Sequence, residues 1–293
     1  MVTAAQADFW GWVPHPEVWA LIAGLVGLYV WAARTIGPKV VPAGTPAVTR
    51  AQWRWFGLGI GLLWLAADWP VHDIGERYLY LVHMQQHLVL TLVVPPVMLL
   101  ATPEWLARLV VGEGRVDRWV HRLARPVPAC LVFSALTLLT HAQFVVNNAS
   151  ENGVFHYGVH TALVISALVF WIPVCGPFPE LRISAPAQML YLFVASIVPT
   201  VPGAWLTFAE GAVYRVYDIP ARLWGISVTT DQQVAGLEMK LIAGSYLWVL
   251  IGLIFFRWAT DQEAGPGKVA APTEVLTYDE VERAFDQHPA PQP

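Results

Sequence analysis

The sequence predicts an all-α membrane protein: a polytopic bundle of about seven transmembrane helices, with the N-terminus outside and the C-terminus inside. Composition carries this prediction. Of 293 residues, 56% are hydrophobic and 13% are charged, and the mean hydropathy is +0.50. A soluble domain has roughly 25% charged residues. The 15 tryptophans suit a chain that meets membrane–water interfaces. The lipid bilayer is therefore the expected environment, and the absence of basic runs gives no reason to expect nucleic acid as a partner.

Seven apolar stretches have lengths near the roughly 20 residues that a bilayer requires. The stretch 52–68 is the shortest of them. We expect residues 1–260 to form the transmembrane domain and residues 261–293 to form a cytoplasmic, mostly flexible tail. Within the tail, Thr277 and Glu280 have capping-box spacing and predict a short helix. The expected spans are 17–34, 52–68, 78–100, 127–147, 155–175, 186–208 and 232–257.

The orientation follows from the basic residues, which gather in the loops on one side. Cytoplasmic loops are enriched in Lys and Arg. Among the 17 basic residues, only Arg77, Arg215 and Arg222 fall on the opposite side, and Lys240 lies within a span. This asymmetry predicts that the C-terminus is inside. The basic loop 101–126 should contain an amphipathic helix on the inner membrane surface.

Prolines are expected to interrupt two of the spans. Pro95 and Pro96 should kink the third, and Pro199 and Pro202 should break the sixth near its outer end. Irregular backbone at membrane depth is tolerated where it is buried in protein or lines a cavity.

The stretch around which the chain is organised is 78–100, which carries His83 and His87. Residues four apart on a helix lie on one face, about 6 Å apart along the axis. A polar pair inside a membrane helix is costly and indicates a functional site.

A second pair, His156 and His160, has the same spacing and falls in the same outer layer, as does His141. Imidazole suits copper, zinc, iron and nickel, and a thioether from Met84 or Met239 adds preference for Cu(I). The two pairs together favour a metal site. His141 taken alone is equally well explained as a packing residue, and both methionines are more often plain packing.

Carboxylates in the same layer are expected to orient the imidazoles. Asp231, Glu238 and Asp68 are the candidates for holding ring N–H groups. Glu238 and Lys240 are two residues apart and face different ways, so each needs its own partner on another helix or in a water-filled cavity. The sequence leaves two roles for Glu238 and Lys240 open: part of a proton or ion path, or a structural ion pair.

Two further kinds of residue have no expected part in the outer site. His72 is interpreted as an outer-loop residue. Cys130 and Cys175 fall at the inner ends of their spans and are expected to be buried structural thiols.

Several motifs together resemble the membrane-integral CtaG family of cytochrome c oxidase assembly factors, over about residues 68–245. H-M-x-Q-H together with D-Q-Q-x-A-G is the more specific combination. The motifs are D-x-P at 68–70, H-M-x-Q-H at 83–87, P-P at 95–96, A-T-P at 101–103, H-x-x-x-H at 156–160, F-W-I-P at 170–173 and D-Q-Q-x-A-G-L-x-M at 231–239.

The resemblance implies a non-enzymatic role in maturing a haem–copper oxidase in the bacterial cytoplasmic (inner) membrane. It implies that copper is handled at the outer side and that oxidase subunits are the partners. The ligands that it implies by position are His83, His87, His156 and His160, with His141 and Met239 as further candidates.

Two other functions remain open from the sequence. The first is a b-type haem oxidoreductase, although pairs four apart present both imidazoles on one side, whereas a haem iron needs them on opposite faces. The second is a transporter for copper or another small solute, which the broken sixth span, Glu238 and Lys240 motivate.

Overall fold

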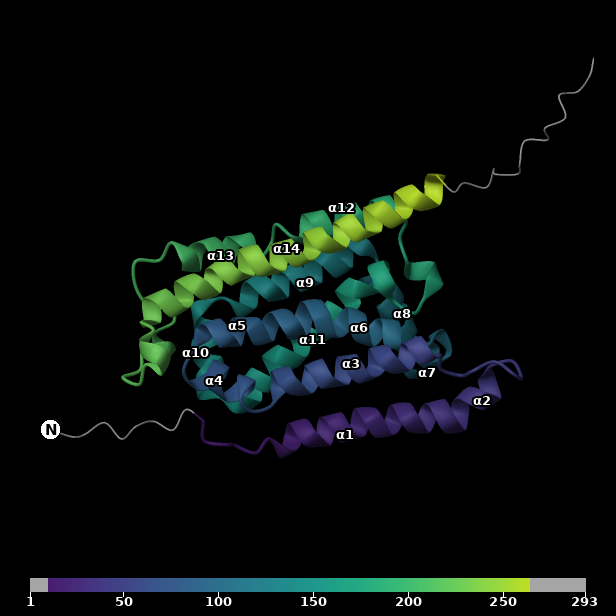
Figure 1. Ribbon diagram of the computed structural model, residues 1–293, viewed down its shortest axis with the longest axis horizontal. Helices are drawn as coiled ribbons and strands as arrows, with labels where there is room; N and C mark the ends of the chain where they lie inside the picture. Colours follow the sequence, from purple (N-terminus) through teal and green to yellow (C-terminus); the bar gives the residue numbers. More distant parts are fainter. Residues whose placement is uncertain (1–9, 264–293) are drawn as a thin grey trace, which may run out of the picture.

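Helices and turns make up all the regular structure of residues 10–263, the part of the chain that the computed structural model describes. The long helices run side by side along one direction (Figure 1). π-helical turns at Ala32–Ile36 and Val89–Val93 join α1 to α2 and α5 to α6. The helices are α1 Pro16–Trp31, α2 Gly37–Val40, α3 Arg50–Ala67, α4 Val71–Arg77, α5 Tyr80–Leu88, α6 Val94–Ala101, α7 Glu104–Val111, α8 Arg115–Leu123, α9 Pro126–Thr140, α10 Gln143–Glu151, α11 Gly153–Cys175, α12 Ala185–Ala195, α13 Thr200–Thr207 and α14 Val228–Glu263.

The predicted membrane-protein class is confirmed, with fewer candidate spans than expected. Among the described residues, five helical segments are long and apolar enough to cross a bilayer, or six if α8 and α9, which meet at 84°, count as one span. The shortest predicted span, now α3, is not among them. The count of seven and the orientation therefore stay predictions. The five segments are Pro16–Val40, Tyr80–Ala101, Gly153–Cys175, Ala185–Thr207 and Val228–Glu263.

The fourth predicted span, 127–147, is wrong as a single helix. The helix α9 ends at Thr140, His141 is its C-cap, and α10 starts at Gln143. A distant loop stabilises the break: the Tyr214 hydroxyl donates to the His141 carbonyl at 2.7 Å, and the Gln143 amide donates to the Val213 carbonyl. Because these partners lie about 70 residues away, the local apolar pattern could not reveal the break.

The third span passes through Pro95 and Pro96 by way of the π-helical turn. Proline has no N–H, so the carbonyls four residues earlier, on Thr91 and Leu92, lose their helical donors. The Trp171 indole donates to the Thr91 carbonyl at 3.0 Å, and the Tyr246 hydroxyl donates to the Leu92 carbonyl at 2.9 Å. Two neighbouring helices therefore satisfy the backbone groups that the prolines release.

The sixth predicted span is broken, as expected. The helix α12 ends at Ala195, a turn runs through Pro199, and α13 begins at Thr200. The Lys240 ammonium donates to the Thr200 hydroxyl at 2.9 Å. The basic side chain on α14 thus has its partner at the start of the helix after the break.

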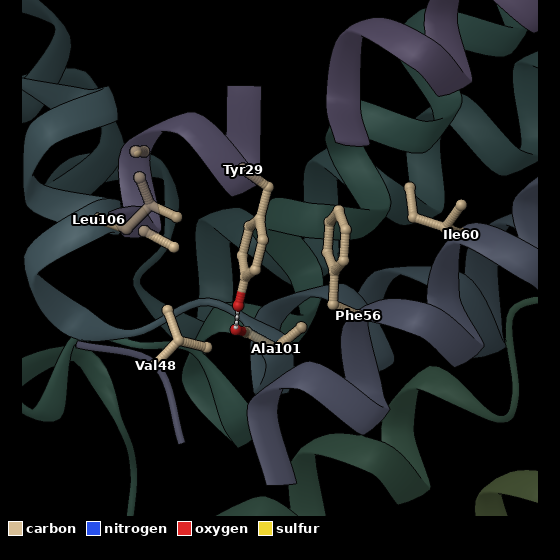
Figure 2. Packing of buried hydrophobic residues seen from close by; sticks show 8 residues of the cluster. Tyr29, Val48, Phe56, Ile60, Ala101 and Leu106 are labelled. Carbon is tan, nitrogen blue, oxygen red and sulfur yellow. Dashed lines mark hydrogen bonds between the residues drawn. The ribbon is translucent and has the colours of Figure 1, made fainter. Parts of the chain in front are cut away.

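A buried cluster packs α1 against α3, α6 and α7 (Figure 2). The ring of Tyr29 stacks on Phe56 with centroids 3.9 Å apart, and its hydroxyl donates to the Ala101 carbonyl at 2.7 Å. A buried hydrogen bond of this kind stabilises a fold by about 1 kcal/mol. It ties the first long helix to the end of the third span.

The short helices lie at the two ends of the bundle. The helices α4 and α10 lie at one end, and α7 and α8 lie at the other (Figure 1). Arg108, Arg115, Arg118 and Arg122 are on α7 and α8, so these arginines lie at the end away from α4. The expected amphipathic helix is α8, and its Val116 and Trp119 side chains are exposed. The expected helix near Thr277 lies outside the described residues, and the division into membrane domain and tail stays a prediction.

Candidate metal centre

The helix that presents His83 and His87 starts at Tyr80 and is capped from another part of the chain. Leu79 occupies the N-cap position without a side-chain hydrogen bond. Instead, the buried carboxylate of Asp231, at the start of α14, accepts the backbone N–H groups of Tyr80 at 2.8 Å and Leu81 at 2.9 Å. These are donors that a helix start leaves without partners. The D-Q-Q motif therefore fixes where α5 begins.

The other two residues of the motif have structural contacts as well. Gln232 accepts the N–H groups of Val213 and Tyr214 and donates to the Tyr214 carbonyl. Gln233 donates to the Ala209 carbonyl at 2.8 Å. The motif thus anchors both α5 and the loop that follows α13.

The two predicted histidine pairs lie face to face. On α5, the rings of His83 and His87 have centroids 4.4 Å apart, and on α11 the rings of His156 and His160 are 4.2 Å apart. Across the two helices, His87 and His160 approach to 4.6 Å. Nitrogens of His83, His87 and His160 lie within 4.8 Å of one another, close enough to hold one metal ion.

Glu76 on α4 links the two pairs. Its carboxylate lies 2.8 Å from Nδ1 of His83 and 3.3 Å from Nε2 of His156. Burial alone would raise the pKa of Glu76, but the neighbouring imidazoles of His83 and His156 outweigh it and lower the pKa to about 2. The side chain is therefore an anion placed between the imidazoles.

Close packing of α4 on α5 brings Glu76 to this place. A Cβ on Gly75 would lie 3.0 Å from the backbone nitrogen and 3.1 Å from the Cα of His83. Only glycine leaves room for that approach without a shift of the neighbouring backbone.

His72 completes a second group with Glu76 and His156, whose ligand atoms also lie within 4.8 Å of one another. The interpretation of His72 as a loop residue is wrong: it lies on α4, one helical turn before Glu76. Burial lowers the pKa of His72, which favours its neutral imidazole. We call His72, Glu76, His83, His87, His156 and His160 the histidine cluster.

The structure brings together four of the six predicted ligands and places the other two beside them. His141 and Met239 are outside the histidine cluster. They line a neighbouring cavity with His87 and Met84. We call it the thioether cavity.

The predicted orienting carboxylates bind other groups. Asp231 accepts backbone N–H groups, as described above. Asp68 accepts from the indoles of Trp19 and Trp64, and Glu238 accepts from the Gln85 amide. The carboxylate on the imidazoles is Glu76, which sequence reasoning missed. The spacing His72-x-x-x-Glu76 places both side chains on one helical face and was a signal for the pair, but it did not reveal their contact with the imidazoles of α5 and α11.

The arrangement is suited to binding a metal ion. Five imidazoles and one carboxylate converge at one end of the bundle, and imidazole is a ligand for copper, zinc, iron and nickel. The carboxylate orients the ring of His83 through a hydrogen bond and lies 3.3 Å from Nε2 of His156, and a carboxylate on a ring N–H is a usual arrangement around metal-binding histidines.

We expect Glu76→Gln to weaken metal binding by roughly 10- to 100-fold, the range for loss of a carboxylate that orients ligand histidines. The amide keeps the shape but loses the charge and one acceptor oxygen. The measurement is a competition titration with a chromogenic Cu(I) chelator. Glu104→Gln, at an exposed site on α7, is the control and should leave the affinity unchanged. Equal affinity in the Glu76 variant would contradict this role.

A multi-span membrane protein with a carboxylate-linked imidazole cluster between its helices is the class that this fold and site define. The family model described as cytochrome c oxidase caa3 assembly factor (Caa3_CtaG) matches residues 27–261. The chain belongs to this family, as the sequence motifs suggested. No curated protein and no solved structure matches the chain.

Proposed function

We propose that this chain is a non-enzymatic assembly factor that binds copper in the histidine cluster, at the outer side of the bacterial cytoplasmic membrane, and passes it to a subunit of a haem–copper oxidase. The observation that carries the proposal is the convergence of His83, His87 and His160 within ligand distance of one another. The chain belongs to a family of cytochrome c oxidase assembly factors, and assembly of that oxidase is the process in which such a site would be used.

The charge pattern supports the outer side. The histidine cluster is at the end of the bundle that carries α4, whereas the arginines of α7 and α8 are at the opposite end (Figure 1). By the positive-inside rule, the arginine-rich end faces the cytoplasm. The metal would then be bound and released outside.

The other two functions have less support. The ring centroid of His87 lies 4.4 Å from that of His83 and 4.6 Å from that of His160, so these rings are packed against one another. The two cavities beside them have volumes of about 50 and 20 Å³. Pockets for organic ligands have roughly 300–1,000 Å³, so a porphyrin does not fit. Lys240 and Glu238, which motivated a transporter, hydrogen-bond Thr200 and Gln85.

The experiment is copper analysis of the detergent-purified chain after loading with Cu(I) under reducing conditions, with the absorption spectrum recorded on the same sample. We expect stoichiometric copper and no Soret band. A chain that holds no copper, or one that shows a haem spectrum, would overturn the proposal.

A further inference from the structure

The thioether cavity adjoins the histidine cluster at His87. Its volume is about 50 Å³, and its walls come from α5, α9, α11, α12 and α14, with Val198 and Pro199 of the turn between α12 and α13. A smaller cavity of about 20 Å³ lies beside Glu76, His83, His156 and His160. His87 lines both cavities, so it is the side chain that connects them.

Two buried nitrogens at the thioether cavity have no hydrogen-bond partner among the described residues. They are Nε2 of His87, a residue that is 8% exposed, and Nε2 of His141, a residue that is 5% exposed. A buried polar atom without a partner costs about 1–3 kcal/mol and calls for an explanation.

The hydrogen bond of His141 fixes which of its nitrogens is free. Nδ1 lies 2.6 Å from the carbonyl oxygen of Thr137. A carbonyl can only accept, so Nδ1 carries the proton and Nε2 carries an unshared electron pair. Neutral imidazole with one nitrogen held by a carbonyl is the form that binds metals.

Two methionines complete the lining. Met84 and Met239 are 2% and 3% exposed and come from α5 and α14. Met84 precedes His87 by three residues, which places both on one face of α5. All four donors are neutral, imidazole is a ligand for copper, and the two soft thioethers favour Cu(I) over harder divalent ions.

We propose that the thioether cavity is a second Cu(I) site, formed by His87, His141, Met84 and Met239, which adjoins the histidine cluster and shares His87 with it. The proposal rests on the proposed function, since copper must first enter the cluster. Transfer between the sites is ligand exchange: as the bonds from Cu(I) to His83 and His160 break, bonds to His141, Met84 and Met239 form, and His87 belongs to both sites. Copper stays Cu(I) throughout, and no electron is transferred.

The thioethers separate this proposal from the simplest competing one. A water molecule in the cavity would also satisfy the two nitrogens, because a cavity of this size has room for it. Changing both methionines to leucine would leave the binding of a water molecule unchanged, whereas Cu(I) would lose two ligands.

The test is X-ray absorption at the copper edge, with a count of Cu(I) per chain, on the full-length protein. The proteins compared are the wild type, the double variant Met84→Leu/Met239→Leu and the control variant Met98→Leu. The sulfur of Met98 packs near Gly59 on α3. Leucine conserves volume and hydrophobicity, so the folds should persist, and thermal unfolding verifies this. We expect sulfur scattering in the wild type and the control. The double variant should lose it.

The outcomes distinguish this site from the proposed function. Copper bound with nitrogen and oxygen scattering alone in all three proteins would overturn the second site and leave the cluster standing. Sulfur scattering that persists in the double variant would also overturn it. A wild type that binds no copper would overturn both.

Discussion

Cells whose sole copy of this chain carries His83→Ala and His87→Ala are expected to make cytochrome c oxidase without its copper. The double change removes two of the three imidazoles in the group with His160. It also removes the side chain that lines both cavities. Because one imidazole of that group remains, we expect the group no longer to bind one Cu(I) ion. Oxidase activity in isolated membranes should fall to that of cells lacking the chain.

The control for this prediction is His121→Ala. His121 is on α8, at the other end of the bundle, where it contacts Asp117 and Glu180. It should leave oxidase activity at the wild-type level. Immunoblotting of the membranes checks that both variants accumulate. Normal oxidase activity in the double variant, with the chain present, would refute the copper-handling proposal.

The largest stability effect is expected from Gly236→Leu, where α14 meets α13. A Cβ on Gly236 would lie 2.5 Å from the carbonyl oxygen of Gly203 and 2.8 Å from Cβ of Leu206. The contact is reciprocal, since a Cβ on Gly203 would lie 2.8 Å from the carbonyl oxygen of Gly236. Small residues let membrane helices approach in this way. A leucine would force the helices apart, and overpacking of this kind costs roughly 1–3 kcal/mol and occasionally more.

The measurement is the thermal unfolding midpoint in detergent, beside Gly252→Leu. Gly252 is on the same helix, and a Cβ there has no atom within 4 Å. The control should therefore unfold near the wild-type temperature, whereas the Gly236 variant should unfold well below it. Equal midpoints for the two variants would show that the close approach of α13 and α14 does not contribute to stability.

The predictable part of the site was its helical spacing. Both histidine pairs follow from a four-residue period, and the structure places them opposite each other on α5 and α11. The broken sixth span was also predictable, because proline acts locally on the backbone. These two features could be predicted because the histidine spacing and the effect of proline on the backbone each act within about one helical turn.

Contacts between distant segments could not be predicted. The role of Glu76 depends on how closely α4 packs on α5, and the break at His141 depends on a loop more than 70 residues away. The intended role of Asp231 was wrong for the same reason. Its carboxylate binds the backbone at the start of the helix that carries His83 and His87, rather than their rings.

The position of Asp231 also determines the sign of the electric field that a cation meets at α5. The first turn of any helix carries a partial positive charge of about half an elementary charge, which repels metal ions. His83 lies only one turn from that end. The carboxylate of Asp231 against the first N–H groups, with Glu76 beside the rings, places negative charge at this helix end. The start of α5 is therefore more favourable for a cation than an uncompensated helix end.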